Sequence, residues 1–135
     1  MTDDRSPRIS VLNDNPEFLE LMAAILDEDA GYNVSLFNGQ ETSVAELSAS
    51  DPDLIIIDLL LGGASGWEIV TLCRADARLA HIPIVVCSAD VTALRDRIGE
   101  LEAIGNVHVL AKPFGIDEVT DLVGGLVGQP LRATG

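Results

Sequence analysis

Four polar residues of the chain, Asp14, Asp58, Ser88 and Lys112, carry functional groups that together suit a divalent metal and a phosphoryl group. Carboxylate oxygens are ligands that Mg²⁺ prefers, and a lysine ammonium pairs with phosphoryl oxygens. A serine hydroxyl adds a hydrogen-bond donor. These groups act together only where a fold brings them to one place, so the interpretation depends on the elements that precede them.

A short apolar run precedes each of the four residues. Continuous runs of Val, Ile and Leu are typical of parallel strands that helices cover on both faces. Ligands of such sheets bind outside the carboxyl ends of the strands, so the four side chains are expected along one edge. The runs are Ile9–Leu12, Leu54–Ile57, Ile82 with Ile84–Val86, and Val107–Leu110.

Each residue taken alone also fits a simple structural role. Asp14 between two asparagines suits a helix cap, and Asp58 suits a turn that ends a strand. Ser88 fits a local cap, and Lys112 before a proline fits an ordinary surface lysine. The functional interpretation therefore rests on the four residues jointly, since all of them lie where a predicted strand ends.

The segments between the strand runs have apolar residues at helical spacing, which predicts strict alternation of strands and helices. The first helix is expected to begin at Asn15, with Pro16 in its first position, and to end at Gly31. The remaining elements are predicted as a strand at 33–37, helices at about 41–49, from 67 on, at about 92–104 and at about 116–127, and a flexible loop at 62–66.

Composition limits the class of protein. A chain of 135 residues with 47% hydrophobic residues fits one domain with a real core. Acidic residues outnumber basic ones 22 to 8, for a net charge of -14, which disfavours nucleic acid as a partner. No apolar run approaches the roughly 20 residues of a membrane helix, and the polar start has no signal-peptide core. We therefore expect a cytoplasmic protein without a membrane partner.

The cysteines and histidines are expected to have no role in chemistry. Cys73 and Cys87 lack the spacing of a metal site, and each falls at an apolar position, so both are predicted to be small buried side chains without a disulfide. His81 and His108 are isolated. Neither is expected to bind a metal or donate a phosphoryl group.

Four short motifs occur in a specific order along the chain, namely Val11–Pro16, Asp53–Leu59, Pro83–Ala89 and Ala111–Phe114. On these motifs the chain resembles the receiver domains of the bacterial response-regulator family from about Arg8 to Val127. The resemblance implies a flavodoxin-like, doubly wound, five-stranded parallel sheet of order 2-1-3-4-5 with five helices. It also implies a receiver domain over 8–128, with flexible segments at 1–7 and 129–135.

The resemblance also implies roles for particular residues. Asp58 would accept the phosphoryl group, because a carboxylate can attack phosphorus and hold the group as an acyl phosphate. Mg²⁺ would bind Asp14, Asp58 and the backbone carbonyl of Leu60, together with phosphoryl and water oxygens. Lys112 would pair with one phosphoryl oxygen, and Ser88 would hydrogen-bond another and so report the phosphate.

Two positions depart from the family pattern. The family has two adjacent acids after the first strand, but here the first is Asn13, whose amide contributes no charge and would reach the metal only through a water. The second departure is Val109, where the family has a Tyr or Phe that works with the residue matching Ser88 as a switch. The first change bears on metal affinity, and the second on the usual output surface.

The leading interpretation is a stand-alone receiver that takes a phosphoryl group from a histidine kinase or phosphotransfer protein. It would act by binding a further protein, and it would be an enzyme only in catalysing its own phosphorylation and dephosphorylation. One alternative is a pseudo-receiver, a scaffold that binds partners without phosphorylation. Another is a flavodoxin-like cofactor binder, although the chain has no recognisable phosphate loop after its first strand.

Overall fold

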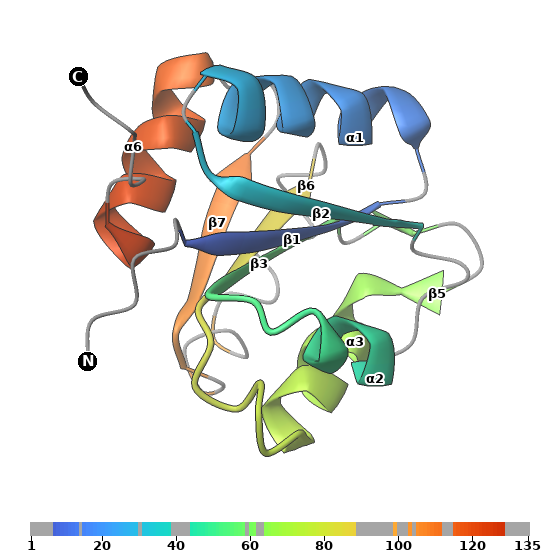
Figure 1. Cartoon of the computed structure of the whole chain (residues 1–135). Coiled ribbons are helices and arrows are strands. Elements are labelled where there is room, and N and C mark those ends of the chain that lie inside the picture. The colour runs from blue at the N-terminus through green and yellow to red at the C-terminus, as the bar shows by residue number, and fades with distance from the viewer. Residues whose placement is uncertain are drawn as a thin grey trace.

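The computed structural model describes residues 7–13, 15–29, 31–38, 44–58, 60–61, 64–88, 99, 103, 105–111 and 115–128. Its centre is a five-stranded sheet of order β2-β1-β3-β6-β7, in which all neighbouring strands run parallel (Figure 1). The predicted order 2-1-3-4-5 is confirmed, since β6 and β7 are the fourth and fifth strands of this sheet. The strands are β1 Arg8–Asn13, β2 Asn33–Asn38, β3 Leu54–Asp58, β6 Ile84–Ser88 and β7 Val107–Ala111.

Helices lie on both faces of the sheet. Helices α1 and α6 cover one face, and α2 and α3 cover the other (Figure 1). The fourth predicted helix, at about 92–104, falls largely outside the described residues, as do the predicted flexible segments apart from Pro7. The helices are α1 Pro16–Met22, the π-helix η1 Ala23–Asp29, α2 Val44–Ala49, α3 Gly66–Ala75 and α6 Ile116–Val127. None of the helices in the described ranges has the length and apolar character to cross a bilayer.

The sheet separates two apolar cores, because successive side chains of a strand point to opposite faces. In β3, Ile55 and Ile57 pack with α2 and α3, whereas Leu54 and Ile56 pack with α1, η1 and α6. All four side chains are at most 1% exposed. This burial on both faces explains why the sequence of the strand is a continuous apolar run rather than an alternating one.

The first helix begins as the sequence predicts. The side chain of Asn15 accepts a hydrogen bond of 2.9 Å from the N–H of Glu17, and Pro16 occupies the first helical position. The helix then widens into the π-helix η1, a difference from the α-helix that the spacing of the apolar residues predicts. Gly31 follows with a φ of 90°, a left-handed conformation that favours glycine at the end of a helix.

The loop predicted at 62–66 is in part wrong. Strand β4 Leu60–Leu61 pairs with β5 Ala64–Ser65 in an antiparallel arrangement, and Gly66 already belongs to α3. Only two residues separate the paired segments along the chain, the usual loop length of a tight hairpin. The connection after β3 therefore contains more regular structure than its glycine content indicated.

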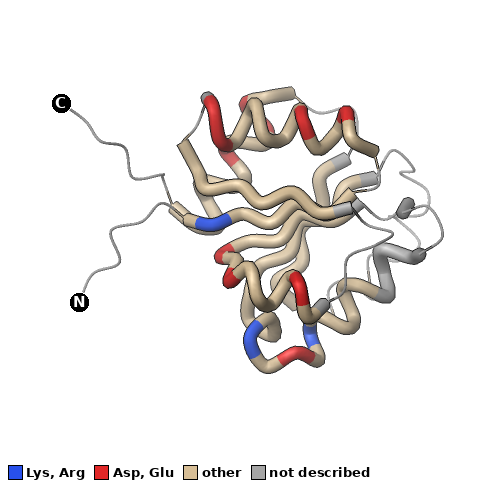
Figure 2. Tube along the Cα trace, turned by 45° about the vertical axis from the view of Figure 1, so that its right-hand side comes forward, with Lys and Arg blue, Asp and Glu red and all other residues tan. Residues whose placement is uncertain are grey.

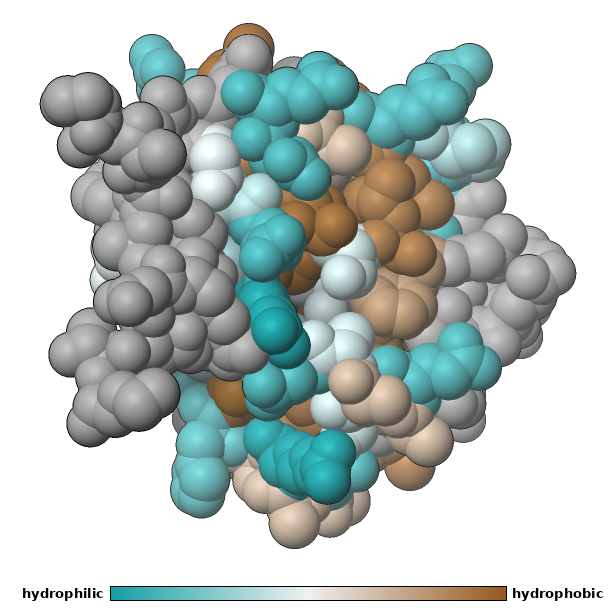
Figure 3. Space-filling view, viewed as in Figure 1, coloured by the Kyte–Doolittle hydropathy of each residue, from teal (hydrophilic) through white to brown (hydrophobic). Residues whose placement is uncertain are grey.

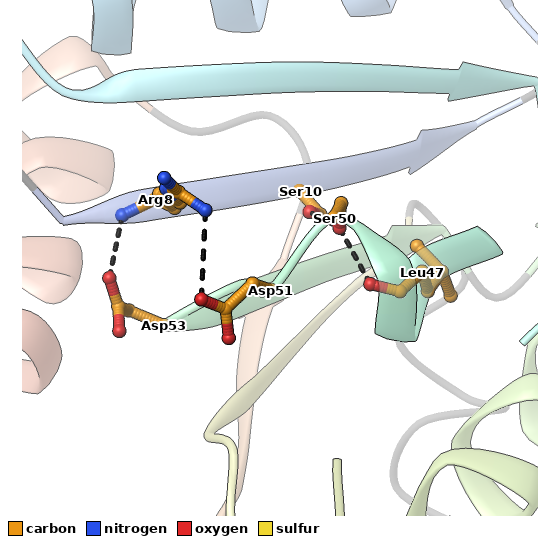
Figure 4. A network of polar contacts seen from close by, with 6 residues as sticks. All are labelled: Arg8, Ser10, Leu47, Ser50, Asp51 and Asp53. Atoms are coloured by element: carbon orange, nitrogen blue, oxygen red, sulfur yellow. Dashed lines mark hydrogen bonds and ion pairs between the residues drawn. The ribbon is translucent and has the colours of Figure 1, made fainter. Parts of the chain in front are cut away.

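Polar contacts hold the amino-terminal edge of the sheet (Figure 4). The backbone N–H of Arg8 donates to the Asp53 carboxylate over 2.8 Å, and the Arg8 guanidinium lies 3.6 Å from Asp51. The Ser50 hydroxyl donates to a backbone carbonyl of α2 at 2.6 Å, and it lies 2.9 Å from the hydroxyl of the buried Ser10. Because the Ser50 hydrogen is used in the first contact, Ser10 is the donor in the second.

The carboxyl-terminal end of the described chain is hydrogen-bonded to the segment that follows η1. The hydroxyl of Tyr32 donates a hydrogen bond of 2.8 Å to the backbone carbonyl of Gly128, which directly follows α6. Tyr32 is only 3% exposed, and this burial raises the pKa of its hydroxyl. The bond therefore ties the last helix to the layer that contains the first one.

Candidate functional site

Four neighbouring strands end at one edge of the sheet. In the parallel register, Leu12 pairs with Ile57 and Asp58 pairs with Cys87, so Asn13 and Asp58 end adjacent strands. Neighbouring strands lie about 4.8 Å apart. The order of the sheet reverses between β1 and β3, and such a switch point is where open α/β sheets bind ligands.

Ser88 ends β6 and pairs with Ala111, which ends β7. The structure describes the backbone of Asp58 and Ser88 at these strand ends. Asp14 and Lys112 lie outside the described residues, and each follows directly on a strand that ends at this edge. The structure thus brings together the strand ends that carry the four predicted residues. The roles of their side chains remain predictions.

The side chain of Asn13, the last residue of β1, is described at this edge. It is 1% exposed, and its side-chain oxygen accepts a hydrogen bond of 2.7 Å from the N–H of Asn15. The side-chain oxygen of Asn15 in turn accepts a hydrogen bond from the N–H of Glu17. Residue 14 therefore lies between two asparagines whose side chains each accept a hydrogen bond from the backbone N–H two residues further along the chain.

The predicted metal ligands are of the chemical type that Mg²⁺ prefers. All the predicted ligands are oxygen atoms, including the carbonyl of Leu60, whose backbone begins β4. An amide side chain such as that of Asn13 is of the chemical type that can hydrogen-bond a metal-bound water, although it carries no charge.

Val109 lies on β7 with 39% of its surface exposed, and it pairs with Val86. It is β-branched and short, in contrast to the aromatic residue expected at this position from the family pattern. The structure thus places the second predicted switch residue on the edge strand β7, which β6 separates from β3.

Both cysteines are buried, as predicted. Cys73 and Cys87 are 0% exposed and are free thiols. Burial raises the pKa of Cys73 to about 11, against a smaller lowering effect of the neighbouring Arg74. Cys73 is therefore a protonated, unreactive thiol at neutral pH.

Sequence reasoning missed Arg74, which connects the segments that precede β6 and β7, at the edge of the sheet opposite to the candidate site. Its guanidinium donates to the carbonyls of Leu79 and Ile82 at 3.1 and 2.8 Å, and to those of Gly105 and Asn106 at 3.1 and 3.0 Å. Partial burial lowers the pKa of Arg74. Its position in the last turn of α3 was the available signal, since cations there bind carbonyl groups.

A family model and several curated proteins match most of the chain. The family model for the response regulator receiver domain matches residues 9–124. Among curated proteins, the transcriptional regulatory protein BaeR of Escherichia coli is 34% identical over 87% of this chain and 46% of its own length. The DNA-binding regulator RpaA of Synechocystis is 32% identical over 93% of this chain and 51% of its own. The chain thus spans about half the length of these relatives.

Solved structures have the same fold. The chemotaxis response regulator CheY4 of Vibrio cholerae superposes with a TM-score of 0.77 at 22% identity, covering 89% of this chain and 98% of that one. The receiver domain of the sensor histidine kinase PA1611 from Pseudomonas aeruginosa superposes with a TM-score of 0.71 at 24% identity, covering 91% and 98%. That receiver domain has a magnesium ion coordinated in its active-site cleft.

Proposed function

Because the chain belongs to the family of response regulator receiver domains, we propose that it accepts a phosphoryl group on Asp58 and then binds a further protein in a phosphorylation-dependent way. The donor is a histidine kinase or a phosphotransfer protein, and the reaction takes place in the cytoplasm. The observation that carries the proposal is the position of Asp58 at the end of β3, beside the end of β1 at the switch point of the sheet.

In the transfer, a carboxylate oxygen of Asp58 forms a bond to phosphorus while the bond from phosphorus to the donor breaks. Lys112 follows the end of β7 and pairs with a phosphoryl oxygen, which spreads the negative charge of a loose transition state. Ser88 ends the strand next to Asp58 and donates its hydroxyl hydrogen to another phosphoryl oxygen. These residues orient the group and balance its charge.

Asp14, Asp58 and the carbonyl of Leu60 would hold Mg²⁺, with Asn13 contributing through a water. When bound, the ion supplies positive charge that lets two negative groups approach each other. The oxygen-only donor set and the magnesium ion in the PA1611 receiver domain support this assignment. The DNA binding named for RpaA is not carried over, because the chain matches about half of that protein and has a net charge of -14.

Intact mass after incubation with acetyl phosphate and Mg²⁺ tests the proposal. The wild type is expected to gain the mass of one phosphoryl group. Asp58→Ala should remove this gain, and Asp58→Asn should greatly reduce it. Asp53→Asn is a matched control, since Asp53 precedes the same strand at its opposite end. Full labelling of Asp58→Ala would refute the assignment.

The alternative is a scaffold that binds partners without phosphorylation. It is favoured by Asn13, which removes one formal charge from the metal site, and by Val109, which replaces the aromatic switch. Absence of any mass gain in the wild type, with Mg²⁺ and acetyl phosphate in excess and with a correctly folded protein, would favour this function over the first.

A further inference from the structure

Strand β2 is an edge strand with an uncharged, partly apolar surface. Residues 31–40 contain no Asp, Glu, Lys, Arg or His, whereas 22% of the whole chain is charged. Leu36 is 42% exposed, and Val34 and Phe37 are partly buried. Edge strands are usually protected from pairing by charges or proline, and β2 has neither. Figure 3 shows hydrophobic side chains gathered around β2 and the helix above it, bordered by hydrophilic residues.

The backbone of β2 presents hydrogen-bonding groups on its outer side. In a parallel strand, the N–H and C=O groups of one residue point to the same side, and successive residues alternate between the two sides. The N–H of Asn33 donates to the carbonyl of Pro7 on the β1 side, at 3.1 Å. By this alternation, Val34 and Leu36 direct their N–H and C=O groups away from β1. They are therefore oriented to pair with an added strand.

The elements packed beside β2 are acidic. Helices α1 and η1 pack against this strand, and residues 16–29 contain no Lys or Arg. Figure 2 shows acidic positions along these helices and no basic one. The acidic residues are Glu17, Glu20, Asp27, Glu28 and Asp29.

We propose that β2 is a docking surface for an extended segment of a partner protein, which adds to the sheet as a sixth strand and carries Lys or Arg beside its apolar residues. Main-chain pairing with an exposed edge is an established mode of peptide recognition. Charge complementarity selects this occupant over a second copy of the chain, because two copies would bring two bodies of net charge -14 and two acidic helices together. The surface is separate from Asp58 and works without phosphorylation.

The probe is a fluorescein-labelled peptide of alternating valine and threonine with two lysines at each end, and the matched peptide has glutamates at the ends. Anisotropy titrations at low salt are expected to show saturable binding of the lysine peptide, at least tenfold tighter than that of the glutamate peptide. Raising the salt should weaken the binding, because exposed charges are screened. Hydrogen exchange should slow at the N–H groups of Val34 and Leu36 when the peptide binds.

Leu36→Pro tests the strand pairing. Proline removes an N–H that faces outward, so the hydrogen bonds to β1 remain, and the lysine peptide should bind at least tenfold more weakly. Leu72→Lys is the control, since Leu72 is an exposed leucine of α3 on the opposite face, and it should leave the affinity unchanged. If the proline variant loses its far-UV circular dichroism, Leu36→Lys replaces it, because it keeps the backbone N–H and adds a cation at the edge.

Three results would overturn the proposal. The first is the absence of saturable binding of the lysine peptide. The second is equal binding by wild type and the folded Leu36 variant, which would place the peptide on the acidic helices alone. The third is a dimer in sedimentation velocity that the Leu36 variant abolishes, which would identify a second copy as the occupant.

Discussion

The side-chain oxygen of Asn13 accepts a hydrogen bond of 2.7 Å from the backbone N–H of Asn15. The contact holds the connection between β1 and α1 without a charge, at the place where the receiver family has an acid. Asp in the same position can accept the same hydrogen bond, so a change to Asp adds charge without removing the contact. Asn13 therefore offers a way to separate the electrostatics of the predicted metal site from its backbone geometry.

We predict that Asn13→Asp tightens Mg²⁺ binding by about 1 kcal/mol, the scale for one added charge about 4 Å away in an exposed site. Without metal, the variant should be slightly less stable than wild type, since it adds repulsion among acids. A Mg²⁺ titration followed by the fluorescence of Trp67, the single tryptophan, measures the affinity. Unchanged or weaker binding would contradict the prediction.

Val109 leads to a second prediction, on the conformational response. A short β-branched side chain cannot reach far enough to fill space that Ser88 would vacate on moving toward a phosphoryl group. A ligand shifts an equilibrium only by its differential affinity for the two states. We expect a beryllofluoride mimic of the acyl phosphate to change amide chemical shifts mainly after Asp58 and Ser88. Equally large, concerted changes from Val107 through Val123 would show that the site remains coupled to β7 and α6, and would contradict the prediction.

Arg74 should contribute strongly to stability. Arg74→Ala removes a donor to four carbonyl groups and leaves partly buried acceptors without it, and we expect a loss of about 2–4 kcal/mol. Urea denaturation measures the change. Arg78→Ala is the control, because Arg78 is exposed, and it should stay within about 0.5 kcal/mol of wild type. Equal stability of the two variants would show that the contacts of Arg74 are energetically minor.

We predict that the buried thiol of Cys73 makes the folded protein less stable at high pH. The pKa of its thiol is about 11 in the folded state, against 9.0 for an unperturbed thiol. The folded state thus holds the proton more tightly, so the contribution is complete below pH 9 and is lost as the pH rises toward 11. The free energy of unfolding, measured by urea denaturation, should fall between pH 8 and pH 10.5 by roughly 2 kcal/mol more in wild type than in Cys73→Ala. Tyr32 titrates in both proteins, so its effect on stability cancels in this comparison. An equal pH dependence of the two proteins would count against the burial argument.

Much of the fold was predictable because single residues carried clear local signals. The run Leu54–Ile57 predicted a strand buried on both faces, and the cap at Asn15 gave the start of α1. The widening into η1 was not predictable, because apolar residues at Ile25 and Leu26 suit an α-helix equally well. The partners of Arg74 were also hidden, since they are backbone carbonyls, two of them 31 and 32 residues away.

The candidate site was predictable only in outline. The order of polar residues after the strands identified the edge, because parallel strands with the order found here end together. The contact of Asn13 with Asn15 was not foreseen, since the same amide also suits a metal-bound water. Sequence pattern gives the residues that meet at an edge, whereas hydrogen-bond partners depend on the conformation of each connection.

The two cores on either side of the sheet differ in how much of the chain they need. The buried residues of the core beneath α2 and α3 come from positions 12–86, whereas the core beneath α1 and α6 requires residues from Ile9 to Val123. During synthesis from the amino terminus, the first core can assemble while the last helix is still inside the ribosome. The first helix, although made early, must wait for α6 before its apolar side is fully covered, and Tyr32 must wait for Gly128. We therefore expect folding on the ribosome to proceed in two stages, with the layer that contains the beginning of the chain closing last.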